Sequence, residues 1–518
     1  MISFLLLSVP VGLLAQQAPA PTPTPHPEIA PVQAIQFAGI TALSSEDLMN
    51  IIGIKPGEPL VPADLSDAIR RIEAAYSERG YLADFVYYEI QGEQPPRTLI
   101  FHIREAHVAE VRITGLVHTR EDVVRRFIQI TPGDLYNQRA IQRSVSRLND
   151  LGIFKEIQGF LQEGPEPGQV IVVVQVKEGK TQRVDLGGTY SPEGRLIGQV
   201  TYTQLNLFGR AQQLIAQVNA GTIAGQFGGQ VTYLDPLLGG PDTTFLAQAF
   251  SNVNYRFSEA LATGEARYFE RRTGVRELIT RPAGTAKTLS YGLRYENTTV
   301  ENLPVSDLTT DITSGKVVIL SARLVQDRRL FLVLPASGNY SSGTLEAGYS
   351  RPDVGGSSGI GKGQFDRRWY IPLNAIDPAE LTSDNPKPTR TLAIRLSAGT
   401  STGNLPFFEQ YFVGGVTDLR GYRESRFWGR NFVTLNTEVR MPITRSFIGV
   451  AFVDVGDAWN SDFLFTSGTS TAFPQHKSFS PQVGEGVGLW WVTDLGTIRI
   501  EYAHGEGNRL HFAVGESF

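Results

Sequence analysis

The sequence predicts two small α+β units in tandem, followed by an all-β antiparallel transmembrane barrel. Three observations lead to this fold class. The front third contains an internal repeat with helical periodicity, and the back two-thirds alternates polar and apolar residues up to the last residue. Glycine is also abundant, at 53 of 518 residues, as a chain with many strands and tight turns requires.

Composition excludes several classes of function. The net charge is −5 with no large basic block, which argues against a nucleic-acid partner. The chain has no cysteine, so it has neither a disulfide framework nor a thiolate site. No stretch approaches the roughly 20 continuous apolar residues of a membrane helix.

The first 31 residues are expected to lie outside the folded units. Residues 1–15 hold the one apolar run, Ile2–Leu14, followed by the small residue Ala15, and we interpret them as a signal peptide. This segment lacks the basic residues that usually open such a peptide. Residues 16–31 are rich in proline and are expected to form an extended linker.

Two segments repeat each other at an offset of 76 residues, which predicts two copies of one domain, at 32–106 and 107–180. Each copy has a strand-like start, a Pro-Gly turn and then apolar residues at helical spacing. Each then reaches a glycine and closes with strands, so the expected order is strand, helix, helix, strand, strand. The matched sets are Ile35–Gly39 with Val111–Gly115, Ile54–Gly57 with Ile130–Gly133, and Leu65, Ile69 and Ile72 with Ile141, Val145 and Leu148.

Residues 181–518 alternate as strands do. In 432–441, apolar side chains occupy one face, and the other carries Glu438 and Arg440 among polar neighbours. The inner face of a β-sandwich must be dry, whereas a transmembrane barrel has a polar lumen and a lipid-facing apolar surface. Divided among sixteen strands, these residues leave about 21 for each strand with its connection, enough for crossing strands of ~9–11 residues.

The spacing of the last strands places one long loop on the outer side. Short connections at 443–447 and 493–495 and long ones at 400–431 and 457–483 separate the predicted strands. Bacterial barrels put short turns on the periplasmic side, so an even strand number makes 400–431 the sixth of eight outer loops. The strands are predicted near 390–399, 432–442, 448–456, 484–492, 496–503 and 509–518.

The end of the chain also suits a barrel. Leu510, Phe512, Val514, Glu516 and Phe518 are expected on one face of the last strand. A terminal aromatic residue on such a strand resembles the insertion signal of bacterial outer-membrane barrels. Phe518 is therefore the candidate signal, and Glu516 departs from the usual apolar residue.

Short motifs in both halves of the chain resemble one known family. Tyr76–Tyr81 and Leu148–Phe154 are typical of the POTRA domain. Leu419-Arg420-Gly421-Tyr422 is close to the V-R-G-F/Y motif in the sixth loop of the Omp85 superfamily. From 32 to 518 the chain resembles that superfamily, in its BamA/TamA-like, surface antigen D15 type, which implies tandem POTRA domains and a 16-stranded barrel. Further motif-like stretches are Phe452–Trp459, Gln204–Gln212, and Asp327–Arg329 with Pro335 and Gly338, in which Arg329 departs from the pattern.

The resemblance implies that the sixth loop folds into the lumen and that its arginine meets acids of the barrel wall. Alternation agrees, because Phe452, Asp454 and Gly456 share one face and Asp454 then points into the lumen. Glu438 and Glu501 are lumen-facing alternatives for the same role. Considered by itself, the sequence of this loop predicts a β-turn with Arg420 in solvent. Strand counting and strand parity reverse that expectation and favour Arg420 as a paired residue inside the barrel.

The function implied by the resemblance is that of a non-enzymatic outer-membrane assembly or insertion factor. POTRA domains in the periplasm would receive unfolded outer-membrane clients by adding client strands to a sheet edge. The sequence leaves open the alternative that the repeats serve only as spacers. The barrel would promote insertion into outer-membrane lipid through a weak seam between its first and last strands. Accessory lipoproteins or a periplasm-spanning partner are left open, and no cofactor, metal or nucleic acid is expected.

Two other functions compete with this one. A two-partner secretion transporter also has two POTRA domains and the same loop motif, and would export one exoprotein through the lumen. Such transporters usually begin with a plug helix, whereas the segment before the first repeat here is rich in proline. A passive porin is disfavoured by the repeats and the inward loop.

No motif supports catalysis. Residues 355–359 fit G-x-S-x-G, but strand-like residues follow them where a hydrolase requires a helix. The seven histidines are scattered without ligand spacing, and no G-x-x-x-x-G-K-[S/T] occurs.

Overall fold

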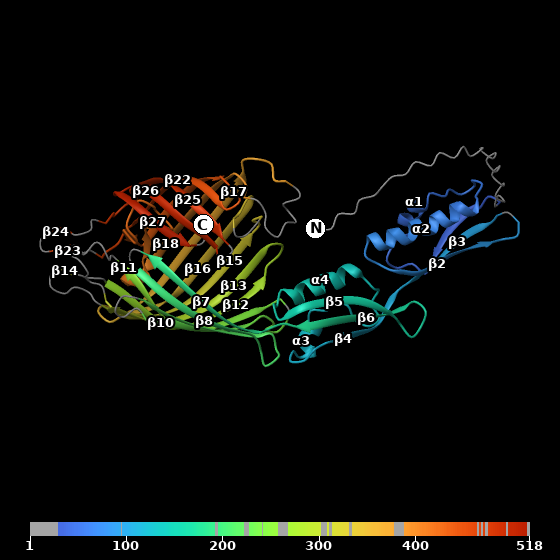
Figure 1. Ribbon diagram of the computed structural model, residues 1–518, viewed down its shortest axis with the longest axis horizontal. Coiled ribbons are helices and arrows are strands. Elements are labelled where there is room, and N and C mark those ends of the chain that lie inside the picture. The colour runs from blue at the N-terminus through green and yellow to red at the C-terminus, as the bar shows by residue number, and fades with distance from the viewer. Residues whose placement is uncertain are drawn as a thin grey trace, which may run out of the picture. The chain divides into compact units, whose positions relative to one another are not determined.

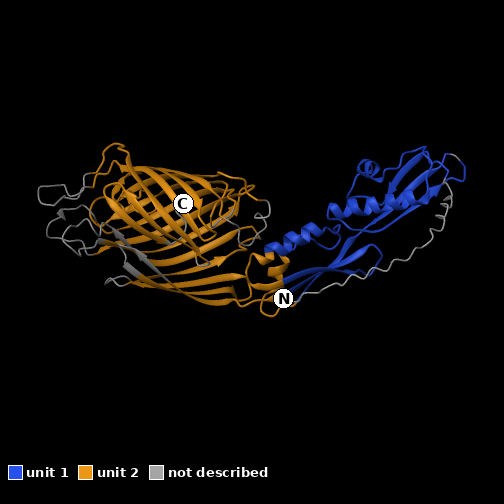
Figure 2. Ribbon diagram, turned by 45° about the horizontal axis from the view of Figure 1, so that its top comes forward, with its two compact units in different colours: residues 1–114, 128–147, 157–176 blue, residues 115–127, 148–156, 177–518 orange. Residues whose placement is uncertain are grey.

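A computed structural model describes residues 30–518 except 95, 192–194, 222–226, 241, 257–267, 302–307, 310–312, 331–333, 378–387, 464–465, 468–469, 472–474, 494–495 and 515–517. The expected signal peptide and nearly all of the linker lie outside the described residues. The chain divides into two compact units (Figure 2), one of residues 1–114, 128–147 and 157–176 and the other of 115–127, 148–156 and 177–518. In the described part of the chain, no helix has the length and apolar character to cross a membrane.

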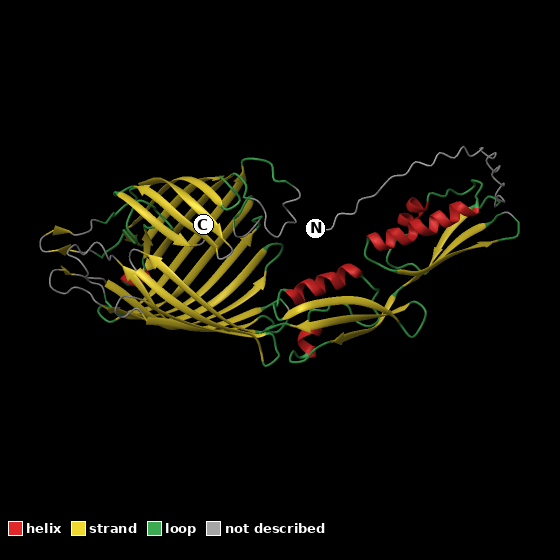
Figure 3. Cartoon of the chain, in the orientation of Figure 1, coloured by secondary structure: helices red, strands yellow, loops and turns green. Residues whose placement is uncertain are grey.

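The two front repeats have the predicted order of elements (Figure 3). In both, the first strand pairs in parallel with the last, which is central, giving the orders β1-β3-β2 and β4-β6-β5. β2 is therefore an edge strand of the first sheet. The elements are β1 (Ala34–Ala38), α1 (Ser45–Ile52), α2 (Pro62–Glu78), β2 (Ala83–Gln91) and β3 (Thr98–Glu105), then β4 (His107–Thr114), α3 (Glu121–Arg125), α4 (Gln138–Asn149), β5 (Phe154–Glu163) and β6 (Gln169–Glu178).

Local sequence explains how these helices begin, end and pack. The Ser44 hydroxyl caps α1 by accepting a hydrogen bond from the backbone N–H of Asp47, and Gly53 ends the helix with a φ of 72°. The predicted helical stripe is buried, with Leu65 and Ile72 inaccessible to solvent in the core of the first repeat. Helical spacing therefore located the core correctly.

The described residues of the back two-thirds contain one sixteen-stranded antiparallel sheet, coiled into a barrel (Figure 1). Each strand pairs with its neighbours in the chain, as the prediction requires. The strands are β7 (Gln182–Ser191), β8 (Arg195–Leu207), β9 (Gln212–Gly221), β10 (Phe227–Asp235), β11 (Thr244–Arg256), β12 (Tyr268–Pro282), β13 (Lys287–Glu301), β15 (Gly315–Asp327), β16 (Gly338–Pro352), β17 (Ser358–Pro372), β18 (Thr391–Gly403), β21 (Asn431–Pro442), β22 (Phe447–Trp459), β25 (Gln482–Thr493), β26 (Gly496–His504) and β27 (Asn508–Val514).

The two faces of the barrel strands differ as predicted. On β21, Asn436, Glu438 and Arg440 are buried on the inner face, whereas Leu435 and Met441 are exposed. Large apolar side chains stand exposed along most other barrel strands, a distribution that suits a surface covered by lipid and not by water. Three short strands in the long loops form a separate small sheet: β14 (Leu308–Thr309), β23 (Thr466–Ser467) and β24 (Ser470–Thr471).

The strand order is open between its two ends, β7 and β27. β27 has seven residues and β7 has ten, and within the described residues no paired ladder joins them. Every other neighbouring pair in the barrel is joined by a ladder. Among the described residues, the boundary between the first and last strands is therefore the least hydrogen-bonded part of the wall.

The prediction that Phe518 shares one face of the last strand with Leu510 and Phe512 is wrong. Leu510 and Phe512 are exposed, but β27 ends at Val514 and Glu516 lies outside the described residues. Phe518 is only 5% exposed, and its carbonyl oxygen accepts a 2.8 Å hydrogen bond from the Tyr370 hydroxyl. Alternation fixes a side chain only while the strand continues. The insertion signal stays a prediction.

Candidate functional site

The sixth outer loop, between β18 and β21, folds onto the inner wall of the barrel. It contains a short helical turn (Phe407–Glu409) and a hairpin of β19 (Tyr411–Val413) and β20 (Phe427–Gly429). We call Leu405–Gln410 the loop base and Gly414–Arg426 the loop tip. Tyr411, Leu419 and Tyr422 join one buried apolar cluster with Phe432 of β21 and Ala458 of β22. This packing explains why the loop is rich in aromatic residues.

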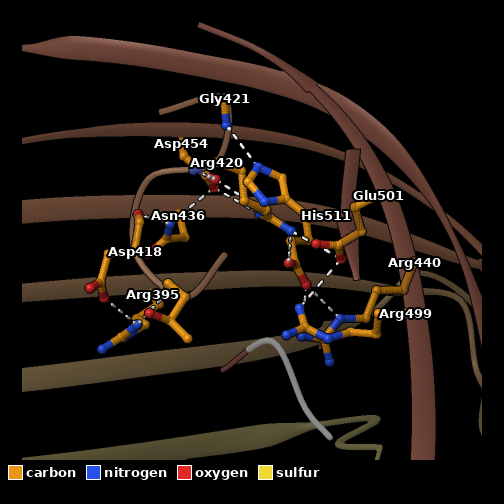
Figure 4. A network of polar contacts seen from close by, with 12 residues as sticks. Arg395, Asp418, Arg420, Gly421, Asn436, Arg440, Asp454, Arg499, Glu501 and His511 are labelled. Atoms are coloured by element: carbon orange, nitrogen blue, oxygen red, sulfur yellow. Dashed lines mark hydrogen bonds and ion pairs between the residues drawn. The ribbon is translucent and has the colours of Figure 1, made fainter. Parts of the chain in front are cut away.

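Arg420 lies at the centre of the loop tip and is 2% exposed (Figure 4). Its guanidinium donates two hydrogen bonds to Asp454 on β22, from Nε at 2.7 Å and from Nη2 at 2.8 Å. Its backbone N–H donates a third to the same carboxylate at 3.1 Å. This forked geometry is specific to arginine, because a lysine presents only a point charge.

Two further wall carboxylates contact Arg420, and we call Arg420 together with the wall residues around it the arginine site. Nη1 of Arg420 lies 2.8 Å from Glu438 on β21 and 3.4 Å from Glu501 on β26, and both acids are fully buried. The guanidinium carbon also lies 3.5 Å from the centre of the Phe452 ring, in cation–π contact. Arg420 thus connects three barrel strands.

The acids have additional partners that balance their charge. Arg440 donates to Glu438 at 2.8 Å, and Arg499 and the Trp490 indole N–H donate to Glu501 at 3.4 and 2.8 Å. Asn436 donates to Asp454 at 2.9 Å and also to the carbonyl of Asp418 in the loop. Three arginines therefore face three carboxylates in the buried arginine site. This balance matters because a buried charge without a partner is strongly destabilising.

Backbone contacts fix the position of the loop tip. Gly421 has a φ of 89°, and a Cβ there would lie 2.5 Å from the carbonyl oxygen of His504. A Cβ on Gly484 of β25 would lie 1.8 Å from the carbonyl oxygen of Arg420. The Gly421 N–H donates to Nε2 of His511 on β27 at 3.3 Å, so this nitrogen acts as an acceptor. The loop tip therefore reaches the last strand of the barrel.

The structure brings together most of the residues singled out from sequence. Arg420, Asp454, Glu438, Glu501 and Phe452 meet directly. Leu419 is fully buried beside Arg420, and the Tyr422 hydroxyl donates to the carbonyl of Val483 at 3.2 Å. Gly456 lies on the lumen face opposite Thr434, two residues beyond Asp454, and adds no polar side chain to the site.

Sequence reasoning missed several members of the arginine site. Asn436, Arg440 and Arg499 have the same strand parity as Glu438 and Glu501, so alternation was sufficient to place them on the lumen face. Trp490 and His511 are not part of the predicted site. The sequence favours Trp490 as an aromatic residue at the membrane interface, but it is buried and its indole donates to Glu501 of the neighbouring strand. His511 joins the site only because the loop tip folds onto β27. Figure 4 shows Asp454, Glu501 and His511, from three different barrel strands, around Arg420 and Gly421.

Two other sequence motifs have structural roles. In Gln204–Gln212, the Asn206 amide donates to the Thr119 hydroxyl at 2.9 Å and accepts from the backbone N–H of Ala211 at 2.8 Å. Arg329, which departs from the mid-barrel pattern, pairs with Asp327 at 2.8 Å. Its unexpected charge is therefore matched locally.

Comparison with known proteins finds the same organisation. Residues 206–518 match the Omp85 superfamily domain, and 30–106 and 106–179 each match the POTRA repeat described as surface antigen variable number repeat. The chain is 24% identical to outer envelope protein 80 of Arabidopsis thaliana, covering 87% of this chain and 62% of that protein. It is 22% identical to the outer membrane protein assembly factor BamA of Neisseria meningitidis, over 91% and 65%. The chain thus spans under two thirds of the length of these relatives.

Solved structures show the same fold. BamA from Haemophilus ducreyi lacking POTRA domains 1–3 superposes with a TM-score of 0.65 at 16% identity, covering 93% of this chain and 98% of that one. CdiB from Escherichia coli superposes with a TM-score of 0.53 at 15% identity, covering 97% and 91%. At these identities the likeness concerns the fold alone.

Proposed function

The chain belongs to the Omp85 superfamily, and from that premise we propose that it is an assembly factor for outer-membrane proteins. It resides in the outer membrane of a bacterial cell with its POTRA repeats in the periplasm. The repeats receive unfolded client chains, and the barrel promotes their insertion into the surrounding lipid. The relationship to the Neisseria assembly factor supports this role.

One observation carries the proposal: the strands on one side of the open boundary are held from inside. The arginine site joins β21, β22 and β26, and the loop tip also contacts His511 on β27. We call the boundary between β7 and β27 the seam. A client strand needs an unpaired edge to pair with, and an edge held in place by the loop offers its N–H and C=O groups without rearrangement.

The first repeat offers a site for clients before they reach the seam. Its edge strand β2 exposes three aromatic side chains, Phe85, Tyr87 and Tyr88, by 52%, 46% and 38%. Main-chain pairing along an edge ignores client sequence, and exposed aromatics favour the apolar residues that alternate in barrel strands. β2 is therefore the expected client-binding edge.

The proposed activity requires no covalent chemistry. A strand that enters lipid must satisfy its backbone groups, and closing a new barrel does so while burying apolar surface in the membrane. Client folding then supplies the driving force. We accordingly expect no catalytic residue, cofactor or metal, and the arginine site positions a loop without activating a substrate.

The activity is tested by reconstituting the whole chain into liposomes and supplying an unfolded outer-membrane barrel. We expect faster folding of this client, measured by heat-dependent gel mobility and protease protection, than in empty liposomes. An unrelated porin at equal density is the control. No acceleration would overturn the proposal.

The two other functions give different results in the same liposomes. A secretion transporter would move a dedicated exoprotein into the interior of the liposome without inserting client barrels into the membrane. A passive porin would give steady solute flux that does not depend on clients. Either result without barrel insertion contradicts the assembly role.

A further inference from the structure

A second buried ionic cluster lies at the loop base, on a different part of the wall from the arginine site. Leu405 and Phe408 pack there against Val317 and Ile319 of β15 and Ile360 of β17, in a cluster that is almost inaccessible to solvent. The loop base is therefore not a simple connection between β18 and the hairpin. It has a packed contact with strands near the middle of the barrel sequence.

Glu409 is the polar centre of this contact and is 2% exposed. Its carboxylate accepts hydrogen bonds from Nη2 of Arg294 on β13, at 3.0 and 3.1 Å, and from Nζ of Lys362 on β17, at 3.2 Å. Arg272 on β12 lies 4.0 Å away and also donates a short hydrogen bond to the carbonyl of Phe408. Three strands thus present cations to one loop carboxylate.

The loop contributes charges of opposite sign at its base and at the arginine site. Arg272 pairs with Glu270 and Glu296, and Arg294 pairs with Glu296, so three wall cations face two paired wall acids before Glu409 is added. Glu346, in register with Lys362 on β16, is a further acid close by. At the arginine site, two wall arginines face three wall acids before Arg420 is added. The loop supplies an acid at one end and a cation at the other.

We propose that Glu409 is a positioning residue that binds the loop base to β12, β13 and β17 independently of Arg420. The loop then spans the lumen between two walls, with opposite charges at residues eleven apart in the chain. Exchanging the two ends would bring Glu409 against the acids Asp454, Glu438 and Glu501, so the charges favour one orientation of the loop. If the arginine site opens, the loop base keeps the loop inside the barrel.

Cysteine labelling in the full-length chain tests this proposal, because the native sequence has no cysteine. Leu405→Cys reports on the loop base and Leu419→Cys on the loop tip, since these side chains are 1% and 0% exposed. Each is combined with Glu409→Gln in liposomes and treated with a membrane-impermeant maleimide. Labelling reports loop position and not assembly, so it stands apart from the proposed function.

We expect Glu409→Gln to raise the labelling rate at residue 405 by at least about tenfold while residue 419 stays protected, because a buried pair has lost one partner. Arg420→Gln should do the reverse. Glu301→Gln is the matched control, since Glu301 pairs with Arg271 on the same strands at 2.8 Å without contacting the loop. Heat-dependent gel mobility verifies that each barrel is folded.

Lys362→Met is a second, milder variant that removes one of the contacts of Glu409 from the wall side and leaves Arg294 in place. It should raise labelling at residue 405 by less than Glu409→Gln does. Where Glu409→Gln also folds, the double variant should raise labelling by less than the product of the two single effects, since the contact between Lys362 and Glu409 is lost in both. Continued protection of residue 405 in every folded variant overturns the proposal. Equal exposure of 405 and 419 overturns it too, because the loop would then move as one unit.

Discussion

Replacing Arg420 with alanine isolates one buried carboxylate. Glu438 keeps Arg440, and Glu501 keeps Arg499 and Trp490. Asp454 loses both guanidinium bonds and, among the described residues, keeps the Asn436 amide and the backbone N–H of residue 420. The penalty therefore falls mainly on Asp454, on β22.

Breaking a buried ion pair from one side costs about 3–5 kcal/mol. The loop can avoid this cost by leaving the wall, so we expect the docked population to fall by roughly two to four orders of magnitude relative to the undocked one. Arg420→Lys should lose much of the same energy, because an ammonium cannot form the fork with Asp454. Asp454→Asn in the Arg420→Ala background should recover part of it, because the unpaired charge is gone.

The assay is a double-mutant cycle on the rate at which liposomes containing each variant fold a reporter barrel. Maleimide labelling of Leu419→Cys in the same variants measures loop docking directly. We expect Arg420→Ala to slow the reporter and expose residue 419, with a coupling to Asp454→Asn of more than about 1 kcal/mol. Reporter folding and protection at the wild-type level in both single variants would refute the reasoning.

Three further predictions follow from other contacts. Gly421→Ala places a Cβ 2.5 Å from the His504 carbonyl oxygen at a φ of 89°, so the loop tip should leave the wall and a cysteine at position 419 should react with maleimide. In the control Gly507→Ala the added Cβ has no atom within 4 Å, so the cysteine at 419 should stay protected. Burial alone would raise the pKa of Glu178, but hydrogen bonds from the backbone N–H groups of Thr119, Val117 and His118 lower it to about 2. The ionised carboxylate therefore stabilises the folded state by about 3 kcal/mol above about pH 4.5, and this stabilisation is lost as the pH falls towards 2. Hydrogen-exchange protection factors of those amides should fall over that range, and a constant value, or an unchanged one in Glu178→Gln, would contradict this. A photo-crosslinker at Tyr87 on β2 should capture unfolded client, and one at Glu156 on β5 should capture less; equal capture would remove β2 as the preferred edge.

Much of the fold followed from local patterns. Helical spacing around Leu65 and Ile72, and strict alternation in residues 431–442, reflect periodicities that tertiary contacts reinforce at every step. The same alternation placed Glu438 and Asp454 in the lumen, so their meeting with Arg420 could be anticipated once the loop was assigned to the inside.

Two kinds of contact could not be predicted from the sequence: those between strands brought together by the curvature of the barrel, and those made by the end of the chain. Glu409 follows two phenylalanines in a loop, and nothing local shows that Arg272, Arg294 and Lys362 converge on it from three strands. Phe518 departed from its expected face because pairing of β27 stops at Val514, after which packing against Tyr370 decides its position. Register along one strand is a local property, whereas proximity across a lumen is not.

The most direct test of the assembly mechanism is a reversible bond across the seam. One cysteine is placed in β7 and one in β27 of the full chain, which has no other cysteine, and reporter folding in liposomes is measured oxidised and reduced. We predict that oxidation stops reporter folding and that reduction restores it, while a matched cysteine pair between β16 and β17 has no effect. Undiminished folding by the oxidised, fully crosslinked seam variant would contradict insertion through this boundary.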